Sequence, residues 1–262
     1  MKTNEGLLRR YDKISHRWNC KEYAGLRRDD LIPKILKYSN LKSLPPKSEI
    51  LDAMCGTGKI GETLNKELKT LGKISKISFT DFSQAMLNQI KTPGSKILSD
   101  IRKTGLPENT FDRIFLRGAL HDLPKKAQPD AIKEVYRLLK NDGLFVLIAA
   151  CSEKDTTKYF DELVNLKDRL AGNAGKMKRH FPTKNDHLNL LEESGFKDIQ
   201  NPFDYDGWIT YSATTEINAE GSAEINNFYQ RLPGKVKEKW KIEKSNRGIT
   251  FYFPYAVLIA RK

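Results

Sequence analysis

The sequence predicts an α/β fold built on a mostly parallel β-sheet. Between residues 48 and 150, short apolar segments alternate with segments in which apolar residues recur at helical spacing. Strands that alternate with helices form βαβ units, which bring parallel strands together in one sheet. The segment 144–150 is apolar at every position, as is typical of a strand buried on both faces. A glycine-rich loop at 56–61 joins the first apolar segment to the first helical one.

The expected elements can be placed in order along the chain. Strands are expected at 49–52, 74–81, 96–98, 111–116, around 199–203 and at 255–260 after the apolar run at 144–150. Helices are expected over 60–71, 84–90, 132–143, 159–170 and 188–191. Ser83 is a suitable cap for the second helix, and Gly72 is a suitable end for the first. Since proline cannot donate to a strand ladder, the paired part of the last strand is expected to start after Pro254.

The regular alternation covers only part of the chain, which suggests additional covering segments. Residues 1–45 are helical and aromatic, and Pro45 and Pro46 separate them from a main domain at 46–262. Regularity also weakens near 151–182 and 205–248. We expect the N-terminal segment and these two insertions to form a lid.

Composition limits the class of protein. The 262 residues suit one large domain. The longest apolar run, at 144–151, is far below the roughly 20 residues of a membrane-spanning helix. No apolar signal region opens the chain, and the three cysteines have no metal or disulfide spacing. We therefore expect a cytoplasmic protein without metal. The net charge of +13 fits a lysine-rich solvated surface, or a surface that attracts nucleic acid or an anionic substrate.

The glycine loop points to a nucleotide-type ligand. Residues 56–61 read G-x-G-x-x-G between a strand and a helix, where ligands bind at the carboxyl edge of a parallel sheet. A dinucleotide such as NAD places its pyrophosphate there, and the carboxylate of Asp52 would repel that anion. S-adenosylmethionine carries an ammonium and a sulfonium and no phosphate, so Asp52 favours it. Ala53 and Ile60 also exclude a P-loop.

Two further carboxylates follow at strand ends. Asp81 ends the second strand and can accept hydrogen bonds from both ribose hydroxyls, which serves NAD and S-adenosylmethionine equally. Phe82 can cover an adenine or can be an ordinary core aromatic. Asp100 ends the third strand and can accept from the adenine amino group, or it can be a surface aspartate.

These motifs together resemble those of a known family. Residues 50–58 (ILDAMCGTG) are similar to motif I of class I S-adenosylmethionine-dependent methyltransferases, and 80–87 (TDFSQAML) are similar to their second motif. The blocks 99–101, 106–107, 111–114, 120–123 and 138–143 continue the similarity in order, with a weaker match at 191–196. The resemblance covers roughly 48–150 and is closest to the branch that includes quinone-biosynthesis and small-molecule enzymes.

The resemblance implies a fold, a cofactor and a set of cofactor-binding residues. The fold would be Rossmann-like, with a mostly parallel seven-stranded sheet, an antiparallel last strand, helices on both faces and a helical lid. The cofactor would be S-adenosylmethionine, converted to S-adenosylhomocysteine, with no metal. The expected cofactor-binding residues are Asp52, Met54, Gly56, Gly58, Asp81, Phe82, Asp100, Ile101 and Arg117.

One position departs from the family pattern. Met54 stands where the family usually has glycine. If the backbone there requires a positive φ, methionine carries strain; otherwise its side chain narrows the methionine end of the pocket.

The acceptor side is expected at the same edge of the sheet. The resemblance places His121 beside the site of methyl transfer as a candidate base, although a purely structural histidine fits as well. Asp122 and Asp12 are weaker candidates. Large aromatic side chains from the covering segments would line an acceptor pocket or form the lid's own core; these are Tyr11, Trp18, Tyr23, Trp208 and Tyr211.

Several functions remain open at this point. The leading hypothesis is methyl transfer to an oxygen, nitrogen or carbon of a small molecule by in-line displacement. An RNA or protein methyltransferase is the second, supported by the net charge and by the basic residues at 176–180. A non-catalytic binding protein is the third, supported by Met54. A dehydrogenase is disfavoured by Asp52. The sequence leaves the acceptor and the oligomeric state open.

Overall fold

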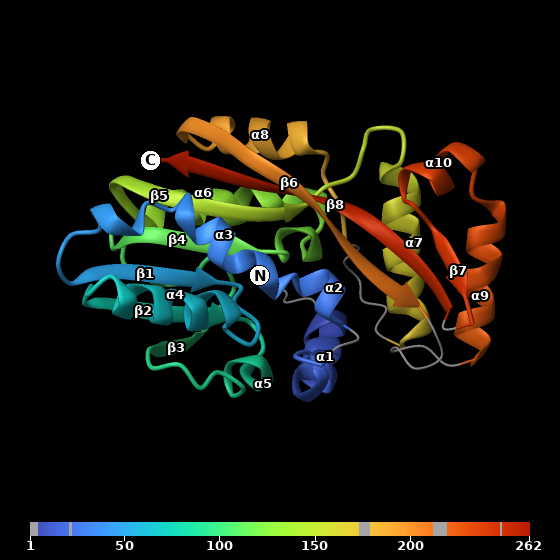
Figure 1. Ribbon diagram of the computed structural model, residues 1–262, viewed down its shortest axis with the longest axis horizontal. Helices are drawn as coiled ribbons and strands as arrows, with labels where there is room; N and C mark the ends of the chain where they lie inside the picture. Colours follow the sequence, from blue (N-terminus) through green and yellow to red (C-terminus); the bar gives the residue numbers. More distant parts are fainter. Residues whose placement is uncertain (1–4, 21–22, 173–178, 212–218, 247) are drawn as a thin grey trace.

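The computed structural model describes residues 5–20, 23–172, 179–211, 219–246 and 248–262. Its centre is one sheet with the strand order β3-β2-β1-β4-β5-β8-β6, to which the short β7 is added through β8 (Figure 1). The strands are β1 (Ser48–Ala53), β2 (Ser75–Asp81), β3 (Ser95–Leu98), β4 (Phe111–Arg117), β5 (Leu139–Ala150), β6 (Lys197–Tyr211), β7 (Glu243–Ser245) and β8 (Gly248–Arg261). Strands β1 to β5 pair in parallel, and β8 is antiparallel to both β5 and β6. The predicted α/β fold, with its mostly parallel sheet and antiparallel last strand, is confirmed.

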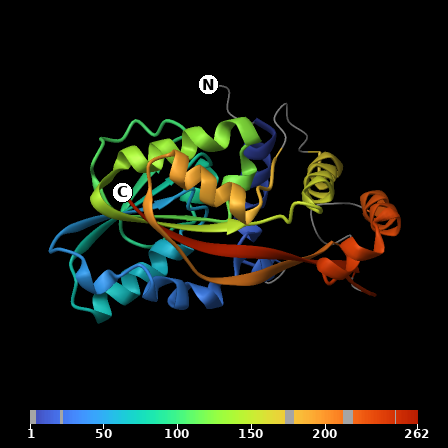
Figure 2. The ribbon, with the colours of Figure 1, turned by 90° about the horizontal axis from the view of Figure 1, so that it is seen from above.

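Helices cover both faces of this sheet. Helices α3 (Ile32–Lys37) and α4 (Lys59–Thr70) lie on one face, and α6 (Gln128–Leu138) and α8 (Lys184–Glu193) lie on the other (Figure 2). Side chains that alternate along the strands build one core on each face. In β5, Val146 and Ile148 pack toward α3 and α4, whereas Phe145 and Leu147 pack toward α6 and α8.

Small residues act at three points of two helices: a start, an end and a close contact with the sheet. Ser83 caps the four-residue α5 (Gln84–Leu87) by accepting a hydrogen bond from the Met86 backbone N–H at 3.2 Å, as predicted. Gly61 lets α4 approach the sheet, because a Cβ there would lie 2.2 Å from the Phe79 ring. Gly72 follows the end of α4 with a φ of 64°, in agreement with its predicted role.

Three predicted boundaries are wrong. The helix expected over 84–90 ends at Leu87. The helix expected to reach residue 143 ends at Leu138, and β5 begins at Leu139, whose backbone is already extended. Strand β8 begins at Gly248 and runs through Pro254. Pro254 is tolerated because it lies just past the last residue pair between β5 and β8, which is Ala150 with Tyr255. The Pro254 carbonyl accepts from the Cys151 N–H, so it points to the β5 side of the strand. The N–H that proline lacks would point to that same side, beyond the paired part of β5.

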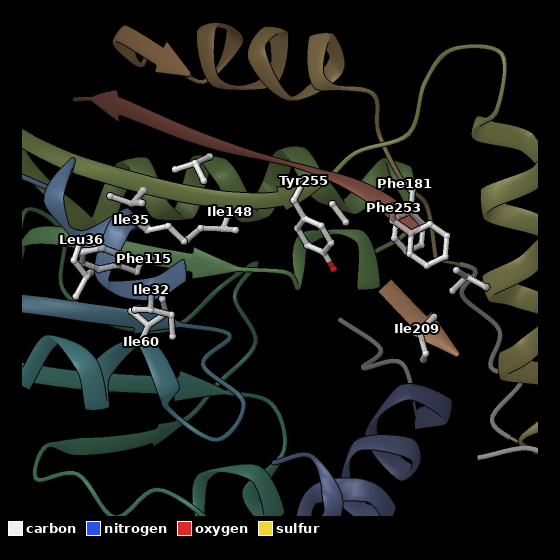
Figure 3. Close-up of a cluster of buried hydrophobic side chains, with 14 of the residues drawn as sticks. Ile32, Ile35, Leu36, Ile60, Phe115, Ile148, Phe181, Ile209, Phe253 and Tyr255 are labelled. Atoms are coloured by element: carbon white, nitrogen blue, oxygen red, sulfur yellow. The ribbon is translucent and has the colours of Figure 1, made fainter. Parts of the chain in front are cut away.

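The far ends of β6 and β8 extend past the sheet into a separate lobe. The lobe contains α7 (Thr157–Leu170), α9 (Ala219–Arg231), α10 (Gly234–Lys239) and β7 (Figure 1). Its aromatic core is continuous with one of the two sheet cores, as the side chains in Figure 3 show. The segment 205–248 therefore begins as strand rather than loop, because β6 stays paired with β8 as far as Tyr211.

The N-terminal helices lie off the carboxyl ends of the parallel strands. Helices α1 (Glu5–Ile14) and α2 (Ala24–Arg27) lie between the sheet and α7 (Figure 1). Among the described residues, no helix is both long and apolar enough to span a bilayer.

Candidate functional site

A cavity opens at the carboxyl edge of the sheet, under the N-terminal helices. Its wall at β1 and β2 is made by Asp52, Met54, Gly56, Asp81 and Phe82. The opposite wall comes from α1, from α7 and from the part of the chain that continues past β4 and β5. One cavity therefore joins the predicted cofactor-binding motifs to the covering segments.

Two buried carboxylates mark the end of the cavity at the glycine loop. Asp52 is 2% exposed and accepts from the Gly61 N–H at 2.9 Å. Asp81 is 5% exposed and accepts from the N–H groups of Gly56 at 2.8 Å and Ser83 at 2.9 Å. Burial raises the pKa of Asp52 to about 7 and that of Asp81 to about 6, although the backbone donors act against this shift. Ionisation of either carboxyl group is therefore costly unless a hydrogen-bond donor or a positive charge of a ligand lies beside it.

Met54 occupies a backbone conformation that favours glycine. Its φ is 49°, and its side chain lines the cavity beside Gly56. A left-handed backbone costs a side chain with a Cβ roughly 1–2 kcal/mol. The first of the two alternatives foreseen for this position, strain in the backbone, therefore applies.

Other predicted cofactor residues divide into those at the cavity and those outside its lining. Arg117 lines it, but its Nη1 donates to Asp29 Oδ1 at 2.9 Å and to the Arg27 carbonyl. Gly58 instead starts α4 with a φ of 73°. Asp100 lies outside the cavity lining, and its carboxylate accepts from the Arg102 guanidinium; Ile101 is buried in the core under α6.

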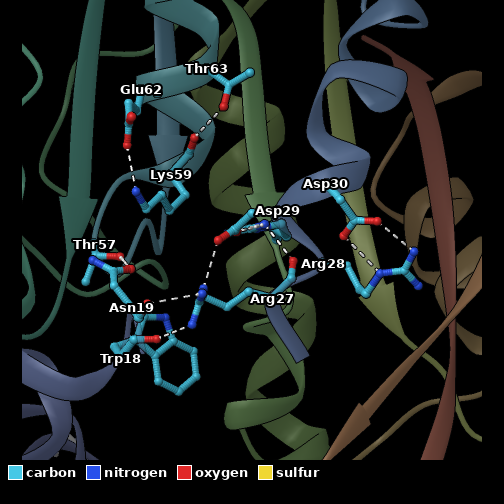
Figure 4. A network of polar contacts seen from close by, with 12 residues as sticks. Trp18, Asn19, Arg27, Arg28, Asp29, Asp30, Thr57, Lys59, Glu62 and Thr63 are labelled. Carbon is cyan, nitrogen blue, oxygen red and sulfur yellow. Dashed lines mark hydrogen bonds and ion pairs between the residues drawn. The ribbon is translucent and has the colours of Figure 1, made fainter. Parts of the chain in front are cut away.

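A network of polar contacts fixes the chain above the glycine loop (Figure 4). Arg27 donates to the carbonyls of Trp18 and Cys20, and its Nε donates to Asp29 at 2.9 Å. The Asn19 side chain accepts from the Thr57 hydroxyl at 2.8 Å, which ties the segment directly to the loop. Trp18 is thereby held over Gly56, where a Cβ would meet its indole nitrogen at 3.8 Å.

The predicted acceptor aromatics are not all in one place. Tyr11 and Trp18 line the cavity, with ring centroids 5.9 Å apart, and Tyr211 lines it from β6. Tyr23 packs behind Trp18 at 5.1 Å and lies outside the lining. Trp208 is 37% exposed and packs with Arg28 away from the cavity. The two-residue period of β6 explains this difference, since Ile209 and Tyr211 share the cavity face and Trp208 points to the other.

His121 is part of the cavity wall and is buried. Its ring stacks on Phe181 at 4.2 Å between centroids, and its Nε2 lies 3.7 Å from Asp122 Oδ1. Burial lowers the pKa of His121 to about 3, although Asp122 opposes the shift. The ring is therefore neutral at ordinary pH. A base with so low a pKa removes protons inefficiently near neutrality.

Sequence reasoning missed a group of buried charges at the other end of the cavity. We call this group the charge cluster: Arg10, Asp122, Lys167, Asp168 and Arg179, each at most 8% exposed. Of these, only Asp122 was considered for the site, and Arg179 was considered only as part of a basic surface. Lys176 and Lys178 of that basic segment lie outside the described residues. One signal was available: Lys167 lies on the apolar stripe of α7, seven residues after Phe160 and four after Leu163.

Comparison with known proteins agrees with the geometry. A family model described as a methyltransferase domain matches residues 50–143. Rat mitochondrial arginine-hydroxylase NDUFAF5 is 41% identical over 102 residues, which are 37% of this chain and 27% of that protein. The demethylmenaquinone methyltransferase of Lactiplantibacillus plantarum is 28% identical over 179 residues, covering 60% of this chain and 73% of that protein. The match to the rat protein therefore spans about a quarter of its length.

The fold also matches solved structures. The YcgJ protein of Bacillus subtilis superimposes with a TM-score of 0.73 at 16% identity, over 89% of this chain and 98% of that one. At this identity the likeness concerns the fold alone. It extends well beyond the matched domain, so the covering segments sit on a shared framework.

Proposed function

The chain is a class I, S-adenosylmethionine-dependent methyltransferase in domain and fold, and from that premise we propose that it transfers a methyl group to a small-molecule acceptor. The observation that carries the proposal is the single cavity that begins at Asp52 and Asp81 and continues under the N-terminal helices to an aromatic and charged end. A cavity closed by α1 and by the segment at Trp18 suits a small acceptor better than a polymer.

The residues at the glycine loop fit S-adenosylmethionine. Asp81 and Asp52 are buried carboxylates on the cavity wall, and the hydrogen bonds described for them come from backbone donors. Ribose hydroxyls at Asp81 and the positive charges of the cofactor near Asp52 would supply the missing partners. Phe82 and Trp18 provide aromatic surface beside them. When bound, this cofactor supplies a methyl group already activated on a sulfonium.

The protein's own contribution is orientation and the exclusion of water. The hydrogen bonds of Arg27 and Asn19 hold the covering segment over the loop, which keeps solvent from the reacting end. An in-line displacement needs no covalent nucleophile. Because His121 is neutral and its pKa is low, we propose that it orients a hydroxyl or amine of the acceptor by a hydrogen bond and does not act as the base that removes the acceptor's proton. Tyr11, Trp18 and Tyr211 would pack against the body of the acceptor.

A protein acceptor is the second candidate. The observation that favours it is the similarity to arginine-hydroxylases, whose printed name refers to an amino-acid side chain. The cover that α1 and Trp18 give the cavity argues for a small molecule, and the chain covers only 27% of the rat protein and 51% of the human one. The RNA hypothesis depends on a basic segment that lies partly outside the described residues. A non-catalytic scaffold would bind the cofactor at Met54 and Asp81 without turnover.

The test has a binding step and a transfer step. Calorimetry should detect S-adenosylmethionine and S-adenosylhomocysteine but not NAD; binding of NAD alone would overturn the cofactor assignment. The full chain is then incubated with methyl-labelled S-adenosylmethionine and a cell extract separated into small-molecule, protein and RNA fractions. Label in the small-molecule fraction is expected. Label in protein or in RNA would replace the proposal with the corresponding alternative, and binding without label would favour the scaffold.

A further inference from the structure

The charge cluster lies at the end of the cavity that the cofactor motifs leave open. Arg179 forms ion pairs with Asp122 and, at 3.6 Å, with Asp168. Lys167 Nζ lies 3.3 Å from Asp168, and Arg10 Nε lies 3.9 Å from the same carboxylate. Arg10, Lys167, Arg179 and Asp122 all line the cavity. Within the cluster as defined, cations outnumber carboxylates by three to two.

Arg179 holds a donor that no acceptor in the described structure uses. The residue is 7% exposed, and its Nε is buried without a hydrogen-bond partner among the described residues. A buried donor left unpaired costs roughly 1–3 kcal/mol, and more when the group is charged. Because Nε belongs to a guanidinium in the cavity wall, an oxyanion entering the cavity would satisfy it with a charge-assisted bond.

The walls next to the cluster are apolar. Phe181, Phe160 and Phe253 line the cavity, with Phe160 in edge contact with both other rings at 4.3 Å. Ile209 lies on the same side. A ligand that reaches Arg179 therefore places the rest of its body against aromatic and aliphatic surface.

We propose that the acceptor is an amphipathic acid, with an oxyanion bound by Arg179, Lys167 and Arg10 and an apolar or aromatic body packed against Phe160 and Phe181. This inference rests on the proposed function, since it assigns the acceptor end of the same cavity. It defines the acceptor by a carboxylate or a phosphate monoester attached to a ring or an alkyl body. The methyl-accepting atom then lies between the anion and the cofactor end.

A purely structural role for the cluster makes a different prediction. The ion pairs also connect α1 with α7 and Arg179 with the turn η5 (Leu120–Asp122), and Tyr11 of α1 donates to Asp122 in that turn. If the cluster served only to fasten these elements, its loss would lower stability without any preference for anions. Ligand selectivity in the intact protein separates the two roles.

The experiment uses the full chain with saturating S-adenosylhomocysteine and three probes of similar shape. Benzoate and phenyl phosphate carry the two oxyanions, and benzamide is the neutral counterpart. Benzoate or phenyl phosphate at millimolar concentration is expected to raise the melting temperature, whereas benzamide is not. Whichever anion gives the larger shift identifies the class of oxyanion. Equal shifts for all three probes, or no shift with any, would overturn the proposal.

Variants then locate the anion. Arg179→Gln is expected to lower the affinity for the anion that gives the larger shift by at least about tenfold. Arg9 is an exposed arginine next to Arg10 on α1, and Arg9→Gln should leave the affinity for that anion unchanged. If Arg179→Gln does not fold, Lys167→Met keeps the length of the side chain and tests the same site. Unchanged anion affinity in the folded variant contradicts the assignment.

Failure of this inference is distinguishable from failure of the proposed function. Calorimetry with S-adenosylhomocysteine alone reports the cofactor end. Cofactor binding without anion preference would leave the methyltransferase proposal standing and remove the acidic acceptor. Anion preference without cofactor binding would leave an anion site standing and remove both the methyltransferase proposal and the assignment of that anion as its acceptor.

Discussion

The two ends of the cavity carry opposite chemistry. At the glycine loop, Asp52 and Asp81 come from adjacent parallel strands and are held by backbone N–H groups. At the far end, Lys167 comes from α7 of the lobe, and the Arg179 guanidinium carbon lies 5.8 Å from the centroid of the Phe181 ring. The shape of the first end is set by the paired strands and by backbone hydrogen bonds, with few side chains involved. The second end exists only where α1, α7 and the extended β6–β8 pair meet, so it depends on tertiary packing.

The largest expected effect comes from disrupting the lobe. Trp240 is 2% exposed and packs against Phe160, Phe251 and Phe253. Trp240→Ala should lower the free energy of unfolding by about 3–5 kcal/mol, measured by denaturant titration. Trp208→Ala removes the same side chain at an exposed site and should cost less than about 1 kcal/mol. The folded Trp240→Ala variant should still bind S-adenosylhomocysteine; loss of both together would show that the two ends are one cooperative unit.

The next effect concerns pH and the first end alone. The folded protein holds a proton on Asp52 up to about pH 7, whereas the unfolded chain releases it near the ordinary value for aspartate. Folding therefore takes up a proton at Asp52 between about pH 4 and 7, and the contribution of this carboxyl to the stability of the ligand-free protein falls as pH rises through this window. Asp52→Asn should reduce the loss of unfolding free energy between pH 4 and 7 by on the order of a few kcal/mol. Melting curves at pH 5 and 8 test it.

An equal pH response in both proteins would mean that Asp52 ionises freely in the fold. The carboxylates of the charge cluster do not interfere in this window. Burial opposes ionisation of Asp122 and Asp168, but Arg179 and Lys167 outweigh it and hold both pKa values below the ordinary one. Their contribution is lost only as pH falls below that ordinary value.

A smaller effect distinguishes the carboxylates at the strand ends. Asp81→Ala should weaken the binding of S-adenosylhomocysteine by about 1–3 kcal/mol, because the ribose hydroxyls lose a charged acceptor. Asp100→Ala removes a carboxylate one strand away that is bound to Arg102, and should change affinity little. Calorimetry on both variants decides. A reversed order would return Asp100 to the cofactor site and remove Asp81 from it.

The smallest effect tests the strain at Met54. Met54→Gly should stabilise the ligand-free protein by roughly 0.5–1 kcal/mol, since relief of the left-handed backbone exceeds the entropy gained by the unfolded chain. Met54→Ala keeps the Cβ and should give no such gain. Thermal melts of the two variants isolate the backbone contribution. Equal stability of Gly and Ala variants would contradict a strained Met54.

The first end of the cavity was open to prediction because its signals are local. Ser83 caps the helix that follows it, Gly72 ends another, and Asp81 closes a strand of alternating residues. Each of these can be seen within a few neighbouring positions. The end of α6 was harder to place, because the turn residues Asn141, Asp142 and Gly143 suggest a helix end there, whereas the backbone is already extended at Leu139.

The second end was not open to prediction, since its residues meet only in the fold. Arg10, Asp122 and Arg179 come from three distant segments, and each resembles a surface residue in sequence. Trp208 lies outside the cavity lining for a related reason. The face of β6 that a residue occupies is set by its register with β8, and that pairing joins residues about 40 positions apart or more.

The place of β8 in the sheet has a consequence for synthesis. This strand comes after all the other described strands in the chain, yet it lies between β5 and β6. Until it has left the ribosome, one edge of β5 and the whole length of β6 lack the partner that they have in the finished sheet. The nascent chain must therefore carry a parallel sheet with an open apolar edge through the synthesis of the entire lobe. Such a chain is expected to depend on chaperones until the 14 residues of β8 close the gap.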